Sequence, residues 1–295
     1  MSKAMQESDF KQRVMITGTG EFLPGTSIEI IREPAGRGQY RHTLFDFDGT
    51  ISLIREGWPE IMIPMCVEIL MATPNHESPE EVREIVHEFV SRLTGKQTIY
   101  QMMALAEEIE KRGGISEDPL VYKQMYIDRL MALISDRREA LRSGKAKPED
   151  MMVPGALNIL KSFKERGVQM YLASGTDEPF VKEEAGLLGM IPYFGEQHVY
   201  GAIDGRLDYS KAMVIQRILA ENKLDGIQLL GFGDAFVEID SVKAVGGTGI
   251  GVASDEAGRS GKPDEWKRER LIGIGADIII PDFREQDVLI GYLFP

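Results

Sequence analysis

Hydrophobic and polar positions follow two different rhythms in this chain of 295 residues. Between residues 58 and 147, apolar side chains recur every three or four positions, the spacing that places them on one face of a helix. The pattern predicts four helices, over residues 61–71, 79–93, 98–111 and 120–141. Almost no strand signal interrupts them, so we expect residues 58–147 to be a helical module inserted into the rest of the chain.

Residues 41–57 and 148–295 instead combine short apolar runs with helical stretches between them. After the insert, the runs that predict strands cover residues 168–173, 227–232, 249–253 and 277–280. Strands that alternate with helices are joined by right-handed crossovers, which make neighbouring strands parallel. We therefore predict an α/β fold with a doubly wound, Rossmann-like, mostly parallel sheet and an inserted α-helical cap domain.

The first 40 residues follow neither rhythm. Strand-like runs at 14–16 and 28–31 are separated by Gly- and Pro-containing turns, including one at 17–20. A similar turn signal lies at 204–205, inside the second α/β part. We expect residues 1–40 to form a β-rich extension of the main domain.

One stretch, His-Thr-Leu-Phe-Asp-Phe-Asp-Gly-Thr at 42–50, ends an apolar run with two carboxylates and a glycine. Residues two apart on a strand point the same way, so Asp46 and Asp48 can share one site. Adjacent carboxylates repel each other unless a cation or a shared proton relieves them. Mg²⁺ suits such a site, because it prefers oxygen ligands and completes its shell with water and substrate phosphate. Taken alone, the stretch is equally compatible with a solvated Asp-rich turn.

Composition and charge narrow the classes of function. The chain is 43% hydrophobic and 27% charged, which is ordinary for a globular protein, and its net charge of −13 opposes non-specific binding to nucleic acid or anionic membranes. No apolar run approaches the length of a membrane span, and residues 1–12 lack the apolar core of a signal peptide. The single cysteine, Cys66, is typical of a reducing compartment. We expect a cytoplasmic protein that binds neither nucleic acid nor membrane, with a homodimer left open.

Polar residues also follow two of the later predicted strands. Ser174 and Gly175 end one of them, and Gly233-Asp234 ends the other. Lys211 opens a predicted helix between these strands. Each residue also has a simple structural role available, as a helix cap, a turn former or a solvated lysine. In open α/β sheets, however, ligands bind beyond the carboxyl ends of the strands, so we expect these residues to converge on the two carboxylates.

The ordered set resembles the haloacid dehalogenase-like (HAD) hydrolase superfamily over about residues 42–282. The first motif of that superfamily, Asp-x-Asp-Gly-Thr, is matched at 46–50, and the second, an apolar strand ending in Ser or Thr, at 171–176. The lysine of the third motif is matched better by Lys211 than by Lys182. The last motif, Gly-Asp and a further acid, is matched at 233–238, although Glu238 stands where relatives often carry Asp. The helical insert is similar to the cap of the phosphoglycolate phosphatase and β-phosphoglucomutase branch.

The resemblance implies a division of roles among these residues. Asp46 would be the nucleophile, Asp48 the general acid and base, and Lys211 the partner of both phosphate and nucleophile. The implied substrate-binding residues are Ser174, Gly175 and Thr50. The implied ligands of a Mg²⁺ cofactor are Asp46, Asp48, Asp234 and Glu238, the last of them through water.

The implied activity is that of a Mg²⁺-dependent phosphatase. Its substrate would be a small phosphorylated metabolite, such as a sugar phosphate or a phosphoglycolate-like compound, hydrolysed through an aspartyl-phosphate on Asp46. A phosphosugar mutase of the β-phosphoglucomutase type and a non-catalytic binding protein that keeps the fold are the alternatives. Arg55, Trp58 and Lys96 are candidate contacts at the entrance of the site, where packing or solvation would explain them equally well.

Overall fold

The computed structural model describes residues 9–15, 20–203 and 210–295 of the chain. The strand-like run at 14–16 and the turns expected at 17–20 and 204–205 lie wholly or partly outside these ranges. Within these ranges, eight strands form one sheet in the order β1-β2-β8-β7-β6-β3-β4-β5. The strands from β8 to β5 run parallel to their neighbours, whereas β1 and β2 extend the β8 edge in antiparallel pairs. The predicted mostly parallel α/β fold is therefore confirmed.

The strands are short, and their bounds are β1 (Glu21–Phe22), β2 (Glu29–Ile30), β3 (His42–Phe45), β4 (Gln169–Asp177), β5 (Val199–Ala202), β6 (Leu229–Gly233), β7 (Thr248–Val252) and β8 (Ile278–Ile280). The helices that pack on the sheet are α5 (Ala156–Glu165), α6 (Glu178–Leu187), α7 (Ile191–Phe194), α8 (Lys211–Asn222), α9 (Phe236–Ala244), α10 (Glu265–Ile274) and α11 (Gln286–Leu293). Short 3₁₀ helices cover Pro148–Met151, Glu196–His198 and Gly226–Gln228.

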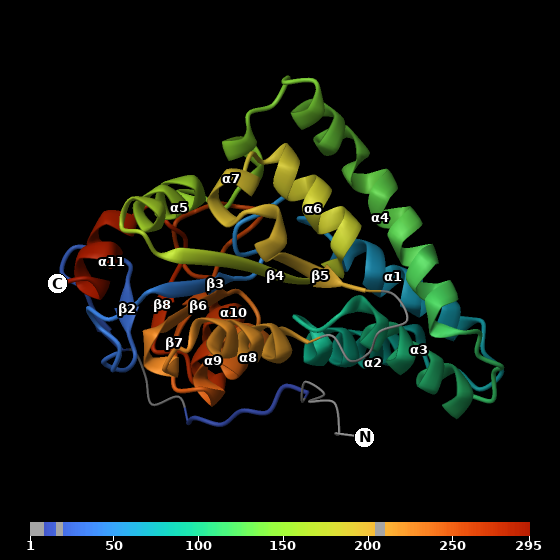
Figure 1. The fold of residues 1–295 in the computed structure, drawn as a ribbon. Helices are drawn as coiled ribbons and strands as arrows, with labels where there is room; N and C mark the ends of the chain where they lie inside the picture. Colours follow the sequence, from blue (N-terminus) through green and yellow to red (C-terminus); the bar gives the residue numbers. More distant parts are fainter. Residues whose placement is uncertain (1–8, 16–19, 204–209) are drawn as a thin grey trace.

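Helices cover both faces of the sheet because successive residues of each buried strand point to opposite sides. Phe45 stacks on Phe232 at 4.7 Å and meets Phe163 of α5 edge to face, on the side covered by α5, α6, α7 and α11. Leu44 lies on the other side, in a cluster with the apolar residues of α8. Figure 1 shows α8, α9 and α10 together on that second face.

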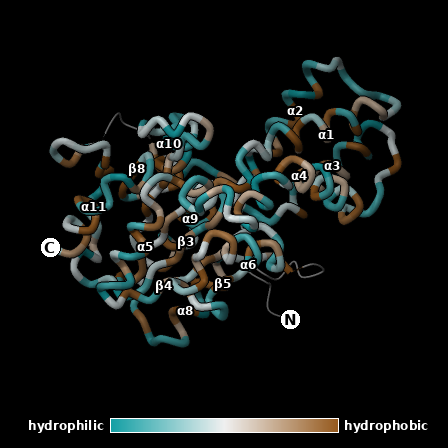
Figure 2. The backbone as a smooth tube through the Cα atoms, turned by 90° about the horizontal axis from the view of Figure 1, so that it is seen from above, coloured by the Kyte–Doolittle hydropathy of each residue, from teal (hydrophilic) through white to brown (hydrophobic). Residues whose placement is uncertain are grey.

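The insert forms four helices, α1 (Pro59–Met71), α2 (Pro79–Leu93), α3 (Thr98–Lys111) and α4 (Pro119–Arg142). Seen from above in Figure 2, they make a lobe beside the sheet domain. Helix α2 begins with a capping box, in which Ser78 and Glu81 satisfy each other's backbone N–H groups, and with Pro79 in the first turn. Its apolar face is buried against the other cap helices. No described helix is long and apolar enough to cross a lipid bilayer.

Candidate active site

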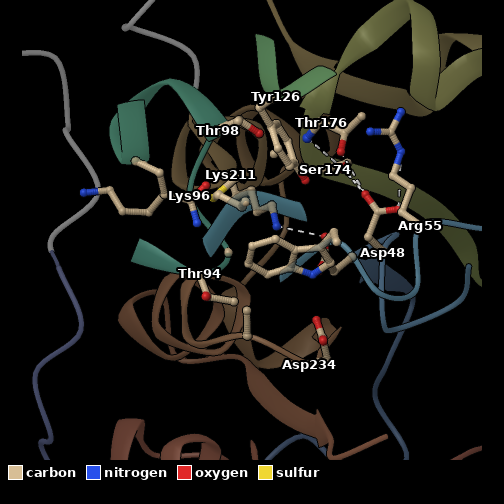
Figure 3. Close-up of a pocket in the computed structure, with 17 residues that line it drawn as sticks. Asp48, Arg55, Thr94, Lys96, Thr98, Tyr126, Ser174, Thr176, Lys211 and Asp234 are labelled. Atoms are coloured by element: carbon tan, nitrogen blue, oxygen red, sulfur yellow. Dashed lines mark hydrogen bonds and ion pairs between the residues drawn. The ribbon is translucent and has the colours of Figure 1, made fainter. Parts of the chain in front are cut away.

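The site lies where the carboxyl ends of β3, β4 and β6 meet beneath the cap. Strand β3 sits between β4 and β6, with Phe45 level with Leu172 on one side and Phe232 on the other. The residues that follow these three strands therefore emerge side by side, as the rule for open α/β sheets requires. They line one pocket together with Lys211 and with cap residues that include Trp58, Lys96 and Tyr126 (Figure 3).

Asp46 is the most enclosed of the acids facing the pocket, with 5% of its surface exposed. Its backbone N–H donates to the carbonyl of Phe232 at 2.9 Å, which fixes it at the end of β3. The ammonium of Lys211 lies 2.9 Å from its Oδ1. Burial raises the pKa of Asp46 to about 6, an effect that Lys211 opposes and that the nearby charge of Asp234 reinforces. The ion pair favours the charged, nucleophilic form of this carboxylate.

Lys211 stands at the start of α8, where the side chain of Ser210 caps the helix. It is 3% exposed and contacts a second carboxylate, that of Glu238, so the lysine is held between two acids. Lys182, the competing lysine, instead pairs with Glu178 within its own helix at 2.7 Å. The structure thus brings Lys211, and not Lys182, to Asp46.

Asp48 has a different set of neighbours. The hydroxyl of Thr176 donates to its Oδ2 at 2.9 Å, and that of Ser174 lies 3.5 Å from the same oxygen. Its Oδ1 is buried without a hydrogen-bond partner, with Nε of Arg55 3.9 Å away. Burial raises the pKa of Asp48 to about 7, against the opposing charge of Arg55. This carboxyl group therefore exchanges a proton closer to neutral pH than an ordinary aspartate does.

Asp234 follows β6 and approaches the turn after β3 very closely. Its backbone N–H donates to the hydroxyl of Thr50 at 2.9 Å. Gly49 has a left-handed backbone with φ of 73°, and a Cβ there would overlap the Asp234 carboxylate. A glycine is therefore needed for the two loops to lie against each other.

The cap closes over this arrangement through the loop between α2 and α3. A Cβ on Gly95 would lie 2.6 Å from that of Ala235, and a Cβ on Gly175 would lie 2.6 Å from the carbonyl oxygen of Lys96. Glycines at both positions let the cap loop rest directly on the core. The space left inside is about 100 Å³, small beside the roughly 300–1,000 Å³ of pockets that enclose drug-sized ligands.

Comparison with known proteins identifies the family. The model of the haloacid dehalogenase-like hydrolases matches residues 40–246, which include all four motifs and the whole cap. The chain belongs to the haloacid dehalogenase-like hydrolases. No curated protein sequence matches it.

Solved structures match this HAD-like hydrolase over most of its length. β-Phosphoglucomutase from Clostridium difficile is 14% identical with a TM-score of 0.58, covering 86% of this chain and 97% of its own. A predicted phosphoglycolate phosphatase from Haemophilus somnus is 14% identical with a TM-score of 0.56, covering 85% and 98%. A CbbY variant from Rhodobacter sphaeroides, in complex with xylulose-(1,5)bisphosphate, is 17% identical with a TM-score of 0.53, covering 83% and 96%. At these identities the likeness extends to the fold alone.

Two residues expected in the HAD-like site lie behind it. The side chain of Thr50 is fully buried and does not line the pocket, because its hydroxyl is used to hold the Asp234 backbone. Contact between Thr50 and substrate stays a prediction. Glu238 is also fully buried behind Lys211, and only its Oε2 lacks a hydrogen-bond partner.

Arg55, Trp58 and Lys96, which we expected at the entrance of the site, all line the pocket. The two cations among them, Arg55 and Lys96, are each paired with a carboxylate of the protein. Arg55 makes two hydrogen bonds of 2.9 Å to Glu184 of α6. The ammonium of Lys96 lies 2.9 Å from Asp9. Neither partner was predictable from local pattern, since Glu184 and Asp9 carry no motif and lie 129 and 87 positions away.

The carboxylate oxygens around the pocket are suitable ligands for a hard cation such as Mg²⁺. The carboxylate of Asp234 is close enough to Asp46 for its charge to raise the pKa of Asp46. Asp48 has a buried oxygen without a hydrogen-bond partner. Across the described ranges, no three His, Cys, Asp or Glu side chains are arranged to hold a metal ion. Mg²⁺ does not need such a cage, because it is usually held by one or two carboxylates, water and substrate phosphate. The residues present therefore fit Mg²⁺.

Proposed function

We propose that this HAD-like hydrolase is a Mg²⁺-dependent phosphatase that acts on a small phosphorylated metabolite through an aspartyl-phosphate on Asp46. The observation that carries the proposal is the pairing of buried Asp46 with Lys211, beside a second acid, Asp48, that has one unpartnered oxygen. One acid is kept charged by an ammonium group, while the other is surrounded by hydroxyl groups and holds a proton more readily. Such a difference is what a nucleophile and a general acid need at the same pH.

The reaction then proceeds in two displacements. A carboxylate oxygen of Asp46 attacks phosphorus, the bond from phosphorus to the ester oxygen breaks, and Asp48 gives its proton to the departing alcohol. A water molecule next attacks the phosphorus of the aspartyl-phosphate, Asp48 takes its proton, and inorganic phosphate leaves with Asp46 regenerated. The Ser174 hydroxyl, the Gly175 N–H and the ammonium of Lys211 hold the phosphoryl oxygens.

Mg²⁺ would be held by the carboxylates of Asp46 and Asp234 and by the backbone carbonyl of Asp48. When bound, it neutralises negative charge on the transferring phosphoryl group and on the carboxylates around it. Glu238 would act from behind by holding Lys211, and it would contact the ion only through water.

The closed cap limits the substrate. The space of about 100 Å³ lies below the roughly 300–1,000 Å³ of ordinary ligand pockets, so a phosphorylated metabolite would enter through an opening of the cap. The CbbY complex with xylulose-(1,5)bisphosphate supports a phosphorylated small molecule as the ligand class. Trp58, Lys96 and Tyr126 of the cap would face its leaving group.

The test is release of inorganic phosphate from a panel of phosphorylated metabolites, with Mg²⁺ and after chelation. Asp46→Asn should lower kcat by a factor on the order of 10³ or more, because no neutral amide replaces the nucleophile. Asp240→Asn is the control, since this carboxylate pairs with Arg13 on the outside of the core. Near-native turnover by Asp46→Asn, or an undiminished rate without divalent cations, would refute the proposal. Transfer of phosphate to a second sugar hydroxyl instead of to water would identify a mutase.

A further inference from the structure

A second buried lysine lies directly behind Asp234. Lys267 belongs to the first turn of α10, its side chain is 11% exposed, and it does not line the pocket. Its Nζ lies 2.8 Å from Oδ2 of Asp234 and 2.6 Å from Oε1 of Glu256. It also donates to the hydroxyl of Ser254 at 3.0 Å. None of the HAD motifs includes this lysine.

These contacts satisfy the ammonium group completely. A lysine ammonium has three N–H donors, and Asp234, Glu256 and Ser254 supply one acceptor each. A buried ammonium with all its donors used is confined to one position, unlike a solvated surface lysine that moves among many rotamers. Lys267 therefore holds Oδ2 of Asp234 at a defined place.

The lysine is itself held from two directions. Its backbone N–H donates to the side chain of Asp264, the N-cap residue of α10, at 2.9 Å. The next residue, Arg268, makes two hydrogen bonds, of 2.6 and 2.7 Å, to Glu29 of β2, which ties the helix to the edge of the sheet. The first turn of α10 is thereby fixed relative to the strands.

The same lysine connects the three loops around the acidic site. Asp234 follows β6, and Ser254 and Glu256 follow β7. The hydroxyl of Ser254 in turn donates to the carbonyl of Gly49, in the turn after β3, at 2.6 Å. A displacement of Lys267 would therefore shift Asp234 and the turn that carries Asp48.

We propose that Lys267 is a positioning residue for Asp234: its ammonium fixes one carboxylate oxygen and so aims the other at the divalent cation. The inference rests on the proposed function for the role of Asp234 as a ligand. Side chains that orient metal ligands typically contribute about 10–100-fold in metal affinity. The competing view is that Lys267 merely balances charge, in which case its removal would strengthen cation binding, because one positive charge fewer would face the ion.

The two views predict opposite results for cation binding without substrate. We would measure Mg²⁺ binding by calorimetry and Mn²⁺ binding by electron paramagnetic resonance on the full chain. Lys267→Met should weaken binding by about tenfold or more, in line with the loss of a ligand's orienting partner. Lys262→Met removes the same charge from an exposed position in the preceding loop and should change binding little. Unchanged or tighter binding by folded Lys267→Met would overturn the inference.

A double variant separates orientation from charge and protects the test against misfolding. Lys267→Met with Glu256→Gln leaves the formal charge of the cluster unchanged and no unpaired Glu256 behind. Binding should remain about tenfold weaker than in the wild type if orientation matters, whereas recovery to the wild-type value would also overturn the inference. Circular dichroism and thermal unfolding verify that each variant is folded.

Asp234→Asn distinguishes failure of this inference from failure of the proposed function. If Asp234→Asn binds the cation as tightly as the wild type, Asp234 is not a ligand and the proposed metal site is wrong. If Asp234→Asn loses binding while both Lys267 variants keep it, the metal site stands and only the role of Lys267 is refuted.

Discussion

Asp46 and Asp48 lie two residues apart, yet their side chains have different neighbours. Asp46 has an ammonium group at 2.9 Å, whereas Asp48 has hydroxyl groups and a guanidinium group at 3.9 Å. Burial raises the pKa of both, to about 6 for Asp46 and about 7 for Asp48. The closer cation at Asp46 favours its charged form, which agrees with the role of nucleophile proposed for it.

The same physics at His42 gives a prediction about stability. This imidazole is buried at the start of β3 and stacks on Tyr171 at 5.8 Å, and its burial lowers its pKa, with Arg41 and His198 adding to the effect. The unfolded chain therefore takes up the His42 proton more readily than the folded protein does. The contribution of His42 to stability should therefore rise as pH increases through the ordinary histidine range near 6.5 and be lost below it, by up to about 1.4 kcal/mol per pH unit. The raised pKa values of Asp46 and Asp48 act in the opposite direction in the same range.

Urea unfolding at pH 5.5 and 7.5 tests this prediction. His42→Phe keeps an aromatic ring against Tyr171 but cannot be protonated. Raising the pH from 5.5 to 7.5 should therefore increase the stability of the wild type more, or decrease it less, than that of this variant. His76→Gln removes an exposed histidine and should leave the wild-type difference in place. The prediction fails if His42→Phe shows the full wild-type difference.

At the scale of elements, the α2–α3 loop determines whether the cap can close. Gly95 in this loop has φ of 96° and faces Ala235 across the contact between cap and core. Gly95→Ala should hold the cap slightly open, and misplacement of about 1 Å at a reacting centre can cost about 100-fold in rate. We expect kcat/KM to fall by roughly 10–100-fold, measured on whichever phosphorylated metabolite the panel identifies.

Gly144→Ala is the matched control, because Gly144 also has a left-handed backbone, with φ of 71°, but nothing lies within 4 Å of a Cβ added there. Both variants place a Cβ on a left-handed backbone, at a cost of about 1–2 kcal/mol, but only Gly95→Ala also brings that Cβ against the core. Equal losses of activity in the two variants would show that closure through Gly95 does not matter.

At the scale of the whole molecule, residues 9–15 connect the core to the cap. On the core side, Phe10 packs edge to face on Phe236 at 5.7 Å and beneath the guanidinium of Arg270 at 3.9 Å. On the cap side, Asp9 pairs with Lys96 and with Arg92. This segment therefore spans the division between the two lobes next to the loop that covers the site.

We expect Asp9→Asn to loosen the cap without unfolding the protein. Its ion pairs are partly exposed and should contribute no more than about 1 kcal/mol, so the melting temperature should change little. Amide hydrogens of residues 94–98 should exchange severalfold faster, because the cap opens more often. Glu88→Gln removes another partner of Arg92 within α2 and should leave the exchange unchanged. Equal exchange in Asp9→Asn and the wild type would contradict the prediction.

Much of the fold was predictable because its elements are specified locally. The periodic apolar positions of α2 and α3 and the capping residues of α2 fixed their bounds to the residue. Helix α11 was not predicted, because its eight residues form no clear periodic pattern. Strand β4 runs on to Asp177 because β5 pairs with it beyond the predicted end, and no local signal reveals such a partner.

The sequence by itself determined the class of fold, the inserted helical cap and the acids and lysine from which the site is built, because periodicity and motif spacing act over a few neighbouring residues. Only the tertiary structure decided which side chains meet. It turned Thr50 inward, brought Lys211 to Asp46, and placed Lys267 behind Asp234. These contacts join residues that lie 33 to 184 positions apart or belong to different strands and helices, so their geometry follows from how the elements pack and not from the pattern along the chain.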